Sequence, residues 1–185
     1  MMTEISLNIL DVAENSVRAD ASLVEISVSA DTAADTLTII IRDNGCGMTK
    51  EQTDKVEDPF FTTRTTRRVG LGIPFFKLAA ESTGGSFEIE SVKGKGTTVT
   101  AVFGLSHIDR MPLGDMTGTM YNLITFNTHI DFLYNYKYDD RYFKLDTREF
   151  KELLGDVPLN VPEVSAYVKE YLTENKAEVD NGAYL

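Results

Sequence analysis

Hydrophobic and polar residues alternate along four short stretches in the first 105 positions of the chain. Strict alternation predicts strands that bury one face, and we expect such strands at residues 23–30, 37–42, 86–91 and 97–105. Helical periodicity and helix-capping residues predict helices, which we place at residues 4–19, 49–58 and 72–82. This order favours an α/β (α+β) two-layer sandwich, in which a mixed sheet carries helices on one face.

Residues 106–185 carry a second and smaller set of patterns. We expect helices at residues 112–126, 147–154 and 162–175 and a hairpin of strands at residues 130–138 and 141–145. The chain is therefore predicted to have three parts, which are residues 1–105 as one domain, residues 106–176 as a small C-terminal α+β extension, and residues 177–185 as a flexible tail. Aromatic residues are dense in the extension, where they form either its core or a surface for a partner or a homodimer.

One side of the first predicted helix carries polar residues that share a face at about 100° per residue. They are Asn8, Asp11, Asn15 and Arg18. A solvated surface would explain them, but asparagine is a mediocre helix former, and its amide oxygen is a suitable ligand for a hard cation such as Mg²⁺. Asp11 lies one turn from Asn15 and offers a base there. A plain helix surface and a functional stripe both fit this pattern.

The second predicted strand ends in a carboxylate followed by a glycine-rich turn. Residues 43–48 read Asp-Asn-Gly-Cys-Gly-Met, so Gly45 and Gly47 closely follow Asp43. Glycine allows positive φ and a close approach of a ligand to the backbone. A carboxylate at a strand end beside such a turn suits a planar ligand with an exocyclic amino group. The simpler interpretation is an Asn-Gly turn between two elements.

A basic segment separates the second and third predicted helices. Residues 62–68 consist of three arginines and four threonines, and Gly-Leu-Gly follows at residues 70–72. The segment has neither helical nor strand periodicity, as expected for a mobile loop that contacts phosphate and opens a helix N-terminus. A plain basic surface loop is the alternative.

Composition narrows the class of partner. The 185 residues include 29 acidic and 18 basic side chains, giving a net charge of −11, which argues against nucleic acid or an anionic membrane as the main partner. No apolar run approaches the ~20 residues of a membrane span, and residues 1–4 lack the features of a signal peptide. The only cysteine, Cys46, excludes an internal disulfide and a cysteine metal cluster. We expect a cytoplasmic protein.

These motifs together resemble the GHKL superfamily of ATP-binding domains, which includes gyrase, heat-shock chaperones, histidine kinases and MutL. The similar segments are residues 14–21 for the N box, 43–48 for the G1 box, 58–64 and 70–73 for the F and G2 boxes, and 94–98 for the entry to the last core strand. Each motif is weak alone, but they occur in the family's order and span about residues 5–104. The combination is a specific signature.

The resemblance implies how adenine would be held. Asp43 would accept a hydrogen bond from the adenine amino group, and Gly45 and Gly47 would let the base lie against the backbone. Met48 would pack nearby, and Thr97 would help to fix adenine, often through a water.

The resemblance also implies ATP or ADP as the nucleotide and Mg²⁺ as the metal. Asn15 would bind an Mg²⁺ ion that bridges the phosphates. Phosphate oxygens would be reached by the side chains of Arg18, Thr63 and Arg64 and by the backbone amides of Gly70, Leu71 and Gly72.

One position departs from the hydrolytic members of this superfamily. Those members place Glu four residues before the metal-binding Asn, where this chain has Asp11 and where many histidine kinases have Asn. We expect Asp11 to be the catalytic base if there is chemistry. Because its side chain is one methylene shorter than Glu, we expect it to activate water poorly.

Three functions fit these features. A stand-alone kinase would transfer the γ-phosphate of ATP to a separate protein, as anti-sigma-like members of the superfamily do. An ATP-driven switch would change dimer or partner contacts with slow hydrolysis, and a nucleotide-sensing regulator would do no chemistry. A histidine kinase needs a phosphoacceptor histidine ahead of the ATP domain, and His107 and His129 both follow it. We therefore expect a domain without its own phosphoacceptor, and a kinase with an unidentified protein partner is the leading interpretation.

Overall fold

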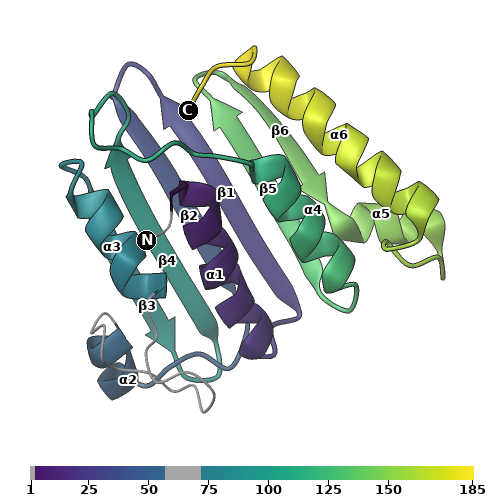
Figure 1. The fold of residues 1–185 in the computed structure, drawn as a ribbon. Coiled ribbons are helices and arrows are strands. Elements are labelled where there is room, and N and C mark those ends of the chain that lie inside the picture. Colours follow the sequence, from purple (N-terminus) through teal and green to yellow (C-terminus); the bar gives the residue numbers. More distant parts are fainter. Residues whose placement is uncertain (1–2, 57–71) are drawn as a thin grey trace.

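The computed structural model describes residues 3–56 and 72–185 as an α/β fold built on one mixed sheet (Figure 1). Its strands are β1 (Leu23–Asp31), β2 (Thr36–Asp43), β3 (Ser86–Val92), β4 (Gly96–Gly104), β5 (Asp131–Tyr138) and β6 (Arg141–Asp146). Its helices are α1 (Ile5–Arg18), α2 (Lys50–Val56), α3 (Gly72–Glu81), α4 (Met116–Phe126), α5 (Thr147–Leu154) and α6 (Pro162–Asp180). The predicted fold class is confirmed.

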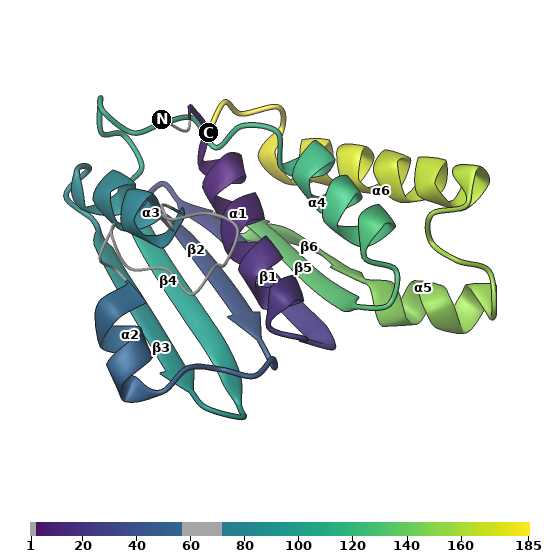
Figure 2. The same cartoon turned by 60° about the horizontal axis from the view of Figure 1, so that its bottom comes forward.

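Helices cover one face of the sheet. In both views α1, α3, α4 and α6 lie over the same side (Figure 1, Figure 2). The alternation in the sequence explains this arrangement, because Val24, Ile26 and Val28 of β1 are all buried while the residues between them are only partly covered. Among the helices of the described residues, none combines the length and the apolarity needed to cross a membrane.

The sheet runs without interruption from the N-terminal part of the chain into the C-terminal part. The strands follow the order β3-β4-β2-β1-β5-β6. β5 lies parallel to β1, with Leu23 opposite Asp131 and Ala30 opposite Tyr138, and β6 pairs antiparallel with β5. The division of the chain into domains at residue 105 stays a prediction, but the strands on either side of it share one sheet and one hydrophobic core.

The last residues of the chain pack against this core. The predicted boundary at residue 176 falls inside α6, which ends at Asp180, and Leu185 is buried. The expected flexible tail over residues 177–185 therefore begins inside a helix and ends in a buried residue.

The beginning of α1 is held by backbone groups from distant segments. No side chain caps the helix. Instead, the amides of Ile5 and Ser6 donate to the carbonyl oxygens of Pro112 and Leu113 at 2.9 and 2.8 Å, and the amide of Leu113 donates to the carbonyl of Leu185 at 2.7 Å. These bonds satisfy two of the four amides that a helix N-terminus leaves without partners, and they tie α1 to the C-terminal segment.

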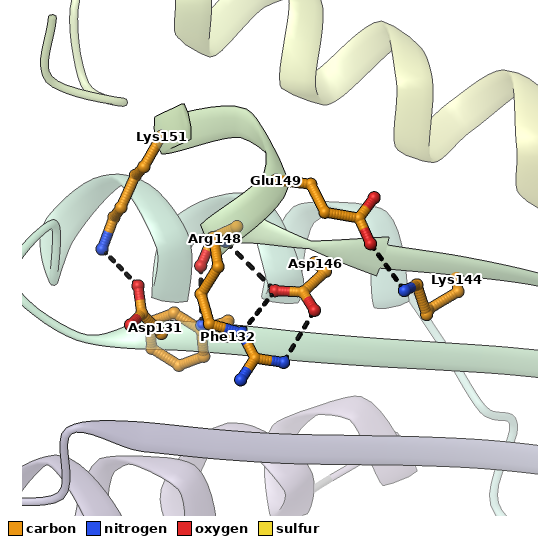
Figure 3. A network of polar contacts seen from close by, with 8 residues as sticks. Asp131, Phe132, Lys144, Asp146, Arg148, Glu149 and Lys151 are labelled. Atoms are coloured by element: carbon orange, nitrogen blue, oxygen red, sulfur yellow. Dashed lines mark hydrogen bonds and ion pairs between the residues drawn. The ribbon is translucent and has the colours of Figure 1, made fainter. Parts of the chain in front are cut away.

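The short helix α5 is fastened to the strands next to it by ion pairs (Figure 3). Lys151 Nζ lies 2.6 Å from Asp131 Oδ1, and the Arg148 guanidinium donates twice to Asp146, at 2.9 and 2.7 Å. The hydrogen bond from Arg148 holds the pKa of Asp146 below its ordinary value, although burial acts in the opposite direction. The edge of the sheet thus fixes the position of α5.

Candidate functional site

An open cavity of about 320 Å³ lies where α1, α2 and α3 meet the ends of β2 and β4. This volume falls at the lower end of the range usual for small-molecule sites. Seven residues that line it were predicted from the sequence as site residues, namely Asn15, Arg18, Asp43, Gly47, Met48, Gly72 and Thr97. Apolar side chains complete the wall, including Val12, Ile41, Ile73, Ile89 and Val99.

The Asp43 carboxylate, which is 8% exposed, is oriented by three hydrogen bonds from the protein. Ser16 Oγ donates to Oδ2 at 2.6 Å, and the amides of Gly45 and Thr97 donate to Oδ1 at 2.9 and 3.3 Å. An ionised carboxylate offers about four acceptor positions. Three are therefore filled from within the protein, which leaves acceptor capacity for a single donor from a ligand in the cavity.

The glycine turn after Asp43 packs tightly between the end of α1 and the hairpin of β3 and β4. Gly47 has φ +58°, and a Cβ on it would collide with the backbone carbonyl of Val92. A Cβ on Gly45 would lie 2.6 Å from the carbonyl oxygen of Ala19. Contacts within the protein thus already require both glycines. Gly47 lines the cavity, whereas Gly45 acts through its amide on Asp43, and their roles toward a ligand stay predictions.

Ser91 links Met48 and Thr97, the other two residues that are predicted to hold adenine. Its Oγ accepts from the amide of Met48 at 2.8 Å and lies 2.8 Å from Thr97 Oγ1. It also donates to the carbonyl of Gly96 at 3.0 Å. Met48 and Thr97 are therefore held at fixed positions on one side of the cavity.

The sequence pattern alone does not identify two serines of this site, Ser16 and Ser91. Ser16 falls on the apolar side of the first helix, and it is 3% exposed. A hydroxyl in an otherwise apolar helix face, directly after Asn15, is the one signal that could have identified it. Ser91 stands at an ordinary alternating strand position, so nothing in the sequence distinguishes it.

The polar stripe predicted on α1 is divided in the structure. Asn8 is fully buried, and its Oδ1 has no hydrogen-bond partner among the described residues. Arg18 lies at the cavity and donates to Asn15 Oδ1 at 3.0 Å and to Glu14 at 2.6 Å. A metal ion at Asn15 Oδ1 would have to share or displace the bond from Arg18.

Asp11 lies against the beginning of α3. A Cβ built on Gly72 would overlap the Asp11 carboxylate, so glycine is the residue that allows this approach. A negative charge is favourable at a helix N-terminus. Asp11 does not appear among the residues that line the cavity, although its neighbour Gly72 does.

The remaining predicted site residues, Thr63, Arg64, Gly70 and Leu71, lie outside the described residues, as does the predicted loop that contains them. Within residues 3–56 and 72–185, no group of three or more His, Cys, Asp or Glu side chains could hold a metal ion. A hard cation here would take Asn15 as a protein ligand and rely on oxygens of a bound ligand and water for the rest, which is usual for Mg²⁺ at phosphates.

Comparison with known proteins places these features in a family. The model of the protein family described as "Histidine kinase-, DNA gyrase B-, and HSP90-like ATPase" matches residues 3–107. The sensor histidine kinase ZraS of Escherichia coli (strain K12) is 31% identical over 99 residues, which cover 54% of this chain and 20% of that protein. The sensor histidine kinase WalK of Bacillus subtilis (strain 168) is 33% identical over 82 residues, which cover 42% and 13% of the two chains. The chain thus spans a fifth or less of the length of these relatives.

A solved structure shares the fold beyond the end of the family match. The N-terminal domain of a DNA repair protein superposes with a TM-score of 0.51 and 15% sequence identity, and the match covers 78% of this chain and 52% of that one. At this identity the likeness shows the fold alone. The family match ends at residue 107, before α4, β5, β6, α5 and α6.

Proposed function

Because the chain belongs to the family of histidine kinase-, DNA gyrase B- and HSP90-like ATPases, we propose that it binds Mg-ATP in the cavity beside α1 and transfers the γ-phosphate to a separate protein. The family assignment makes residues 3–107 an ATP-binding, histidine kinase-like ATPase domain. The transfer itself is the proposal. A nucleophilic atom of the partner forms a bond to the γ-phosphorus, the bond from that phosphorus to the bridging oxygen breaks, ADP leaves, and a base accepts the partner's proton.

The carboxylate of Asp43 is the observation that carries the adenine side of the proposal. Its three internal donors fix its orientation and leave acceptor capacity for one more hydrogen bond. The adenine amino group is a donor of the right kind, and the apolar walls of Ile41 and Val99 suit the faces of a flat ring.

The phosphate side is supported by three other residues that line the cavity. Asn15 offers an amide oxygen for Mg²⁺, Arg18 offers a guanidinium for phosphate oxygens, and Gly72 begins a helix whose N-terminus attracts anions. When bound, Mg²⁺ would neutralise phosphate charge. The role of Arg18 requires that it exchange its bond to Asn15 for one to the ligand.

Asp11 is our proposed base for the transfer. It stands one helical turn before Asn15 and next to Gly72, so it borders the region that the γ-phosphate would occupy. A short carboxylate held against a helix terminus is poorly suited to positioning a free water. It can accept a proton from a nucleophile that a partner protein positions.

One observation favours a second candidate, an ATP-dependent switch with slow hydrolysis or a nucleotide-sensing regulator without chemistry. The Asp11 carboxylate packs against Gly72 and is not among the residues that line the cavity. If it stays there when nucleotide binds, binding would rearrange the elements around the cavity without transferring phosphate.

Calorimetry with ATP and ADP tests the binding site. Replacing Asp43 with alanine removes a charged hydrogen bond that contributes ~1.5–3 kcal/mol, so affinity for both nucleotides should fall roughly ten- to a hundredfold. Asp31→Ala is the matched control, since Asp31 also ends a strand but lies outside the cavity. Unchanged affinity in a folded Asp43→Ala protein would remove the proposal.

Labelled ATP then separates the functions. The purified protein is incubated with γ-labelled Mg-ATP and a cell extract of its source. Label on another protein chain, lost with Asp43→Ala, supports the kinase. Release of free phosphate alone supports the switch, and nucleotide binding with neither product supports the sensor.

A further inference from the structure

The C-terminal segment carries an apolar surface that neither the sheet nor another helix covers. Leu153 of α5 is 89% exposed, Tyr167 of α6 is 56% exposed, and Val157 between the two helices is 43% exposed. Phe150, three residues before Leu153 on α5, is partly buried, and its ring centroid lies 6.1 Å from that of Tyr167 and 5.7 Å from that of Tyr171. We call these five residues the α5–α6 patch.

The α5–α6 patch packs against aromatic residues of the sheet. Tyr171 stacks edge-on against Phe143 of β6 at 6.4 Å, and Phe143 is buried against Tyr134 and Tyr136. Ion pairs fix α5 to the sheet edge (Figure 3). The exposed side chains therefore stand on a fixed base, which lowers the ordering cost of binding a partner.

Acidic side chains outnumber basic ones around the patch. Residues 147–180 contain eight acidic and four basic side chains. All four basic side chains are engaged within the protein: Arg148 with Asp146, Lys151 with Asp131, Lys176 with Asp180, and Lys169 over the ring of Tyr121. The acidic side chains beside the patch are exposed and have no hydrogen bond or ion pair within the part of the chain that the structure describes. They are Glu152, Asp156, Glu163 and Glu170.

Helical spacing places these carboxylates at the margin of the apolar residues. Glu163 precedes Tyr167 by four residues and Glu170 follows it by three, so both are its neighbours on the surface of α6. Glu152 and Asp156 adjoin Leu153 and Val157 in the chain. An apolar centre with a negative rim is complementary to a segment that has an apolar face and positive margins.

We propose that the α5–α6 patch is a docking surface for a basic, amphipathic segment of a partner protein. The surface lies outside the residues that match the ATPase family, and the proposal does not depend on any transfer of phosphate. Leu153 and Tyr167 would be the apolar anchors, and Glu163 and Glu170 would select positive charge. The full chain and a designed probe are sufficient to test it.

The probe is a fluorescein-labelled peptide of Leu and Lys patterned as an amphipathic helix, with an otherwise identical Leu and Glu peptide for comparison. Anisotropy should show that the full chain binds the Lys peptide, more weakly as salt rises, and does not bind the Glu peptide. Leu153→Ser should weaken binding about tenfold, the effect of losing one buried leucine. The matched control is Ile108→Ser, because Ile108 is 94% exposed and lies outside the patch.

Charge is tested separately. Glu163→Gln combined with Glu170→Gln should weaken binding of the Lys peptide and flatten its salt dependence, whereas Glu88→Gln with Glu90→Gln on β3 should do neither. Equal binding of both peptides, equal loss with Ile108→Ser, or no binding at all would overturn the proposal. So would sedimentation that shows a homodimer abolished by Leu153→Ser, since a second copy would then occupy the patch.

Discussion

At the scale of single residues, the hydroxyl of Ser16 connects the helix that carries Asn15 to the carboxylate of Asp43, our proposed acceptor for adenine. Its bond to Asp43 is the shortest of the three that the carboxylate accepts. Removing it would leave Asp43 oriented by only the two backbone amides of Gly45 and Thr97 and would cost about 1 kcal/mol of stability. If Asp43 binds adenine as we propose, Ser16 would act on the ligand through Asp43.

We therefore expect Ser16→Ala to weaken binding of ATP and ADP several-fold while the protein stays folded. Fluorescence titration with a nucleotide analogue measures the affinity, and thermal unfolding measures the stability. Ser165→Ala is the matched control, because Ser165 is also a buried serine whose hydroxyl is hydrogen-bonded, but it lies in α6. The Ser165→Ala change should lower the stability and leave the affinity for nucleotide unchanged. If both variants change affinity equally, the effect comes from general loosening of the fold.

A second residue-scale prediction concerns the two acids near Asn15. Glu14 binds Arg18 at the surface, whereas Asp11 faces Gly72. Asp11→Asn should bind Mg-ATP almost normally and lose turnover, while Glu14→Gln should keep turnover. Asp11→Glu, which restores the acid of the hydrolytic relatives, should raise release of free phosphate. An inactive Glu14→Gln protein beside an active Asp11→Asn protein would reverse our assignment of the base.

Residues that stand out from their local pattern could be predicted, and those that fit it could not. Asp43 ends a strand with a charge that two glycines closely follow, and Asn15 is a mediocre helix former within a helix. Ser16 and Ser91 occupy positions where a hydroxyl is ordinary, so their hydrogen bonds emerge only once the strands and α1 are placed. For Asn8 the pattern is misleading, because its helical angle predicts a place on the polar stripe, whereas its side chain is buried.

At the scale of elements, α6 is held to β5 by a buried carboxylate. Asp180 is 2% exposed and accepts from Tyr136 at 2.8 Å and from Lys176 at 2.6 Å. Burial acts to raise the pKa of Asp180, but the hydrogen bonds from Lys176, Tyr136 and Gly182 outweigh it and hold the pKa below its ordinary value. Burial, followed by the bond to Asp180, raises the pKa of Tyr136.

This arrangement predicts a dependence of stability on pH. A carboxyl group whose pKa is lower in the folded protein contributes stability above its unfolded pKa, near 4, and loses that contribution as the pH falls through its folded pKa. Asp180→Asn should therefore lower the free energy of unfolding at pH 7 by about 1–3 kcal/mol, with a smaller difference below about pH 4. Asp156→Asn, at an exposed position, should leave the free energy of unfolding unchanged at both pH values. A difference that is constant from pH 3 to 7 would contradict the role of the charge.

Most elements could be predicted because each follows from its own local pattern. The helix predicted over residues 147–154 has those bounds in the structure. α6 extends past its predicted end because Lys176 and Asp180 pair one turn apart and Asn181 ends it in the left-handed conformation, with φ 52°. The sequence shows both features, but it does not show the hydrogen bond from Tyr136 of β5 to Asp180, which also holds this turn.

At the scale of the whole molecule, the neighbours of each strand could not be predicted. Alternation shows which face of a strand is buried but not which strand lies beside it. The hairpin of β5 and β6 was therefore expected in an extension, whereas it continues the central sheet through the parallel pairing of β5 with β1. The expected domain boundary at residue 105 can be tested directly.

A fragment of residues 1–107, the part that matches the family, would lack β5 and leave β1 as an open edge. It would also lose α4 and α6 from one face of the sheet. We expect this fragment to aggregate or to unfold without a cooperative transition, as measured by sedimentation and circular dichroism against the full chain. A monomeric fragment that unfolds cooperatively and binds ATP would instead establish residues 1–105 as an independent domain.

The pairing of β1 with β5 also sets an order of events during synthesis. Asn135 of β5 meets Ser27 of β1 across 108 positions of sequence. At translation rates of about 5–20 residues per second, β1 leaves the ribosome roughly 5–20 s before its parallel neighbour. By the end of that interval the nascent chain carries β1 to β4 but still lacks β5, the parallel neighbour of β1. Until β5 emerges, the edge of β1 stays open to chaperones that shield exposed strands.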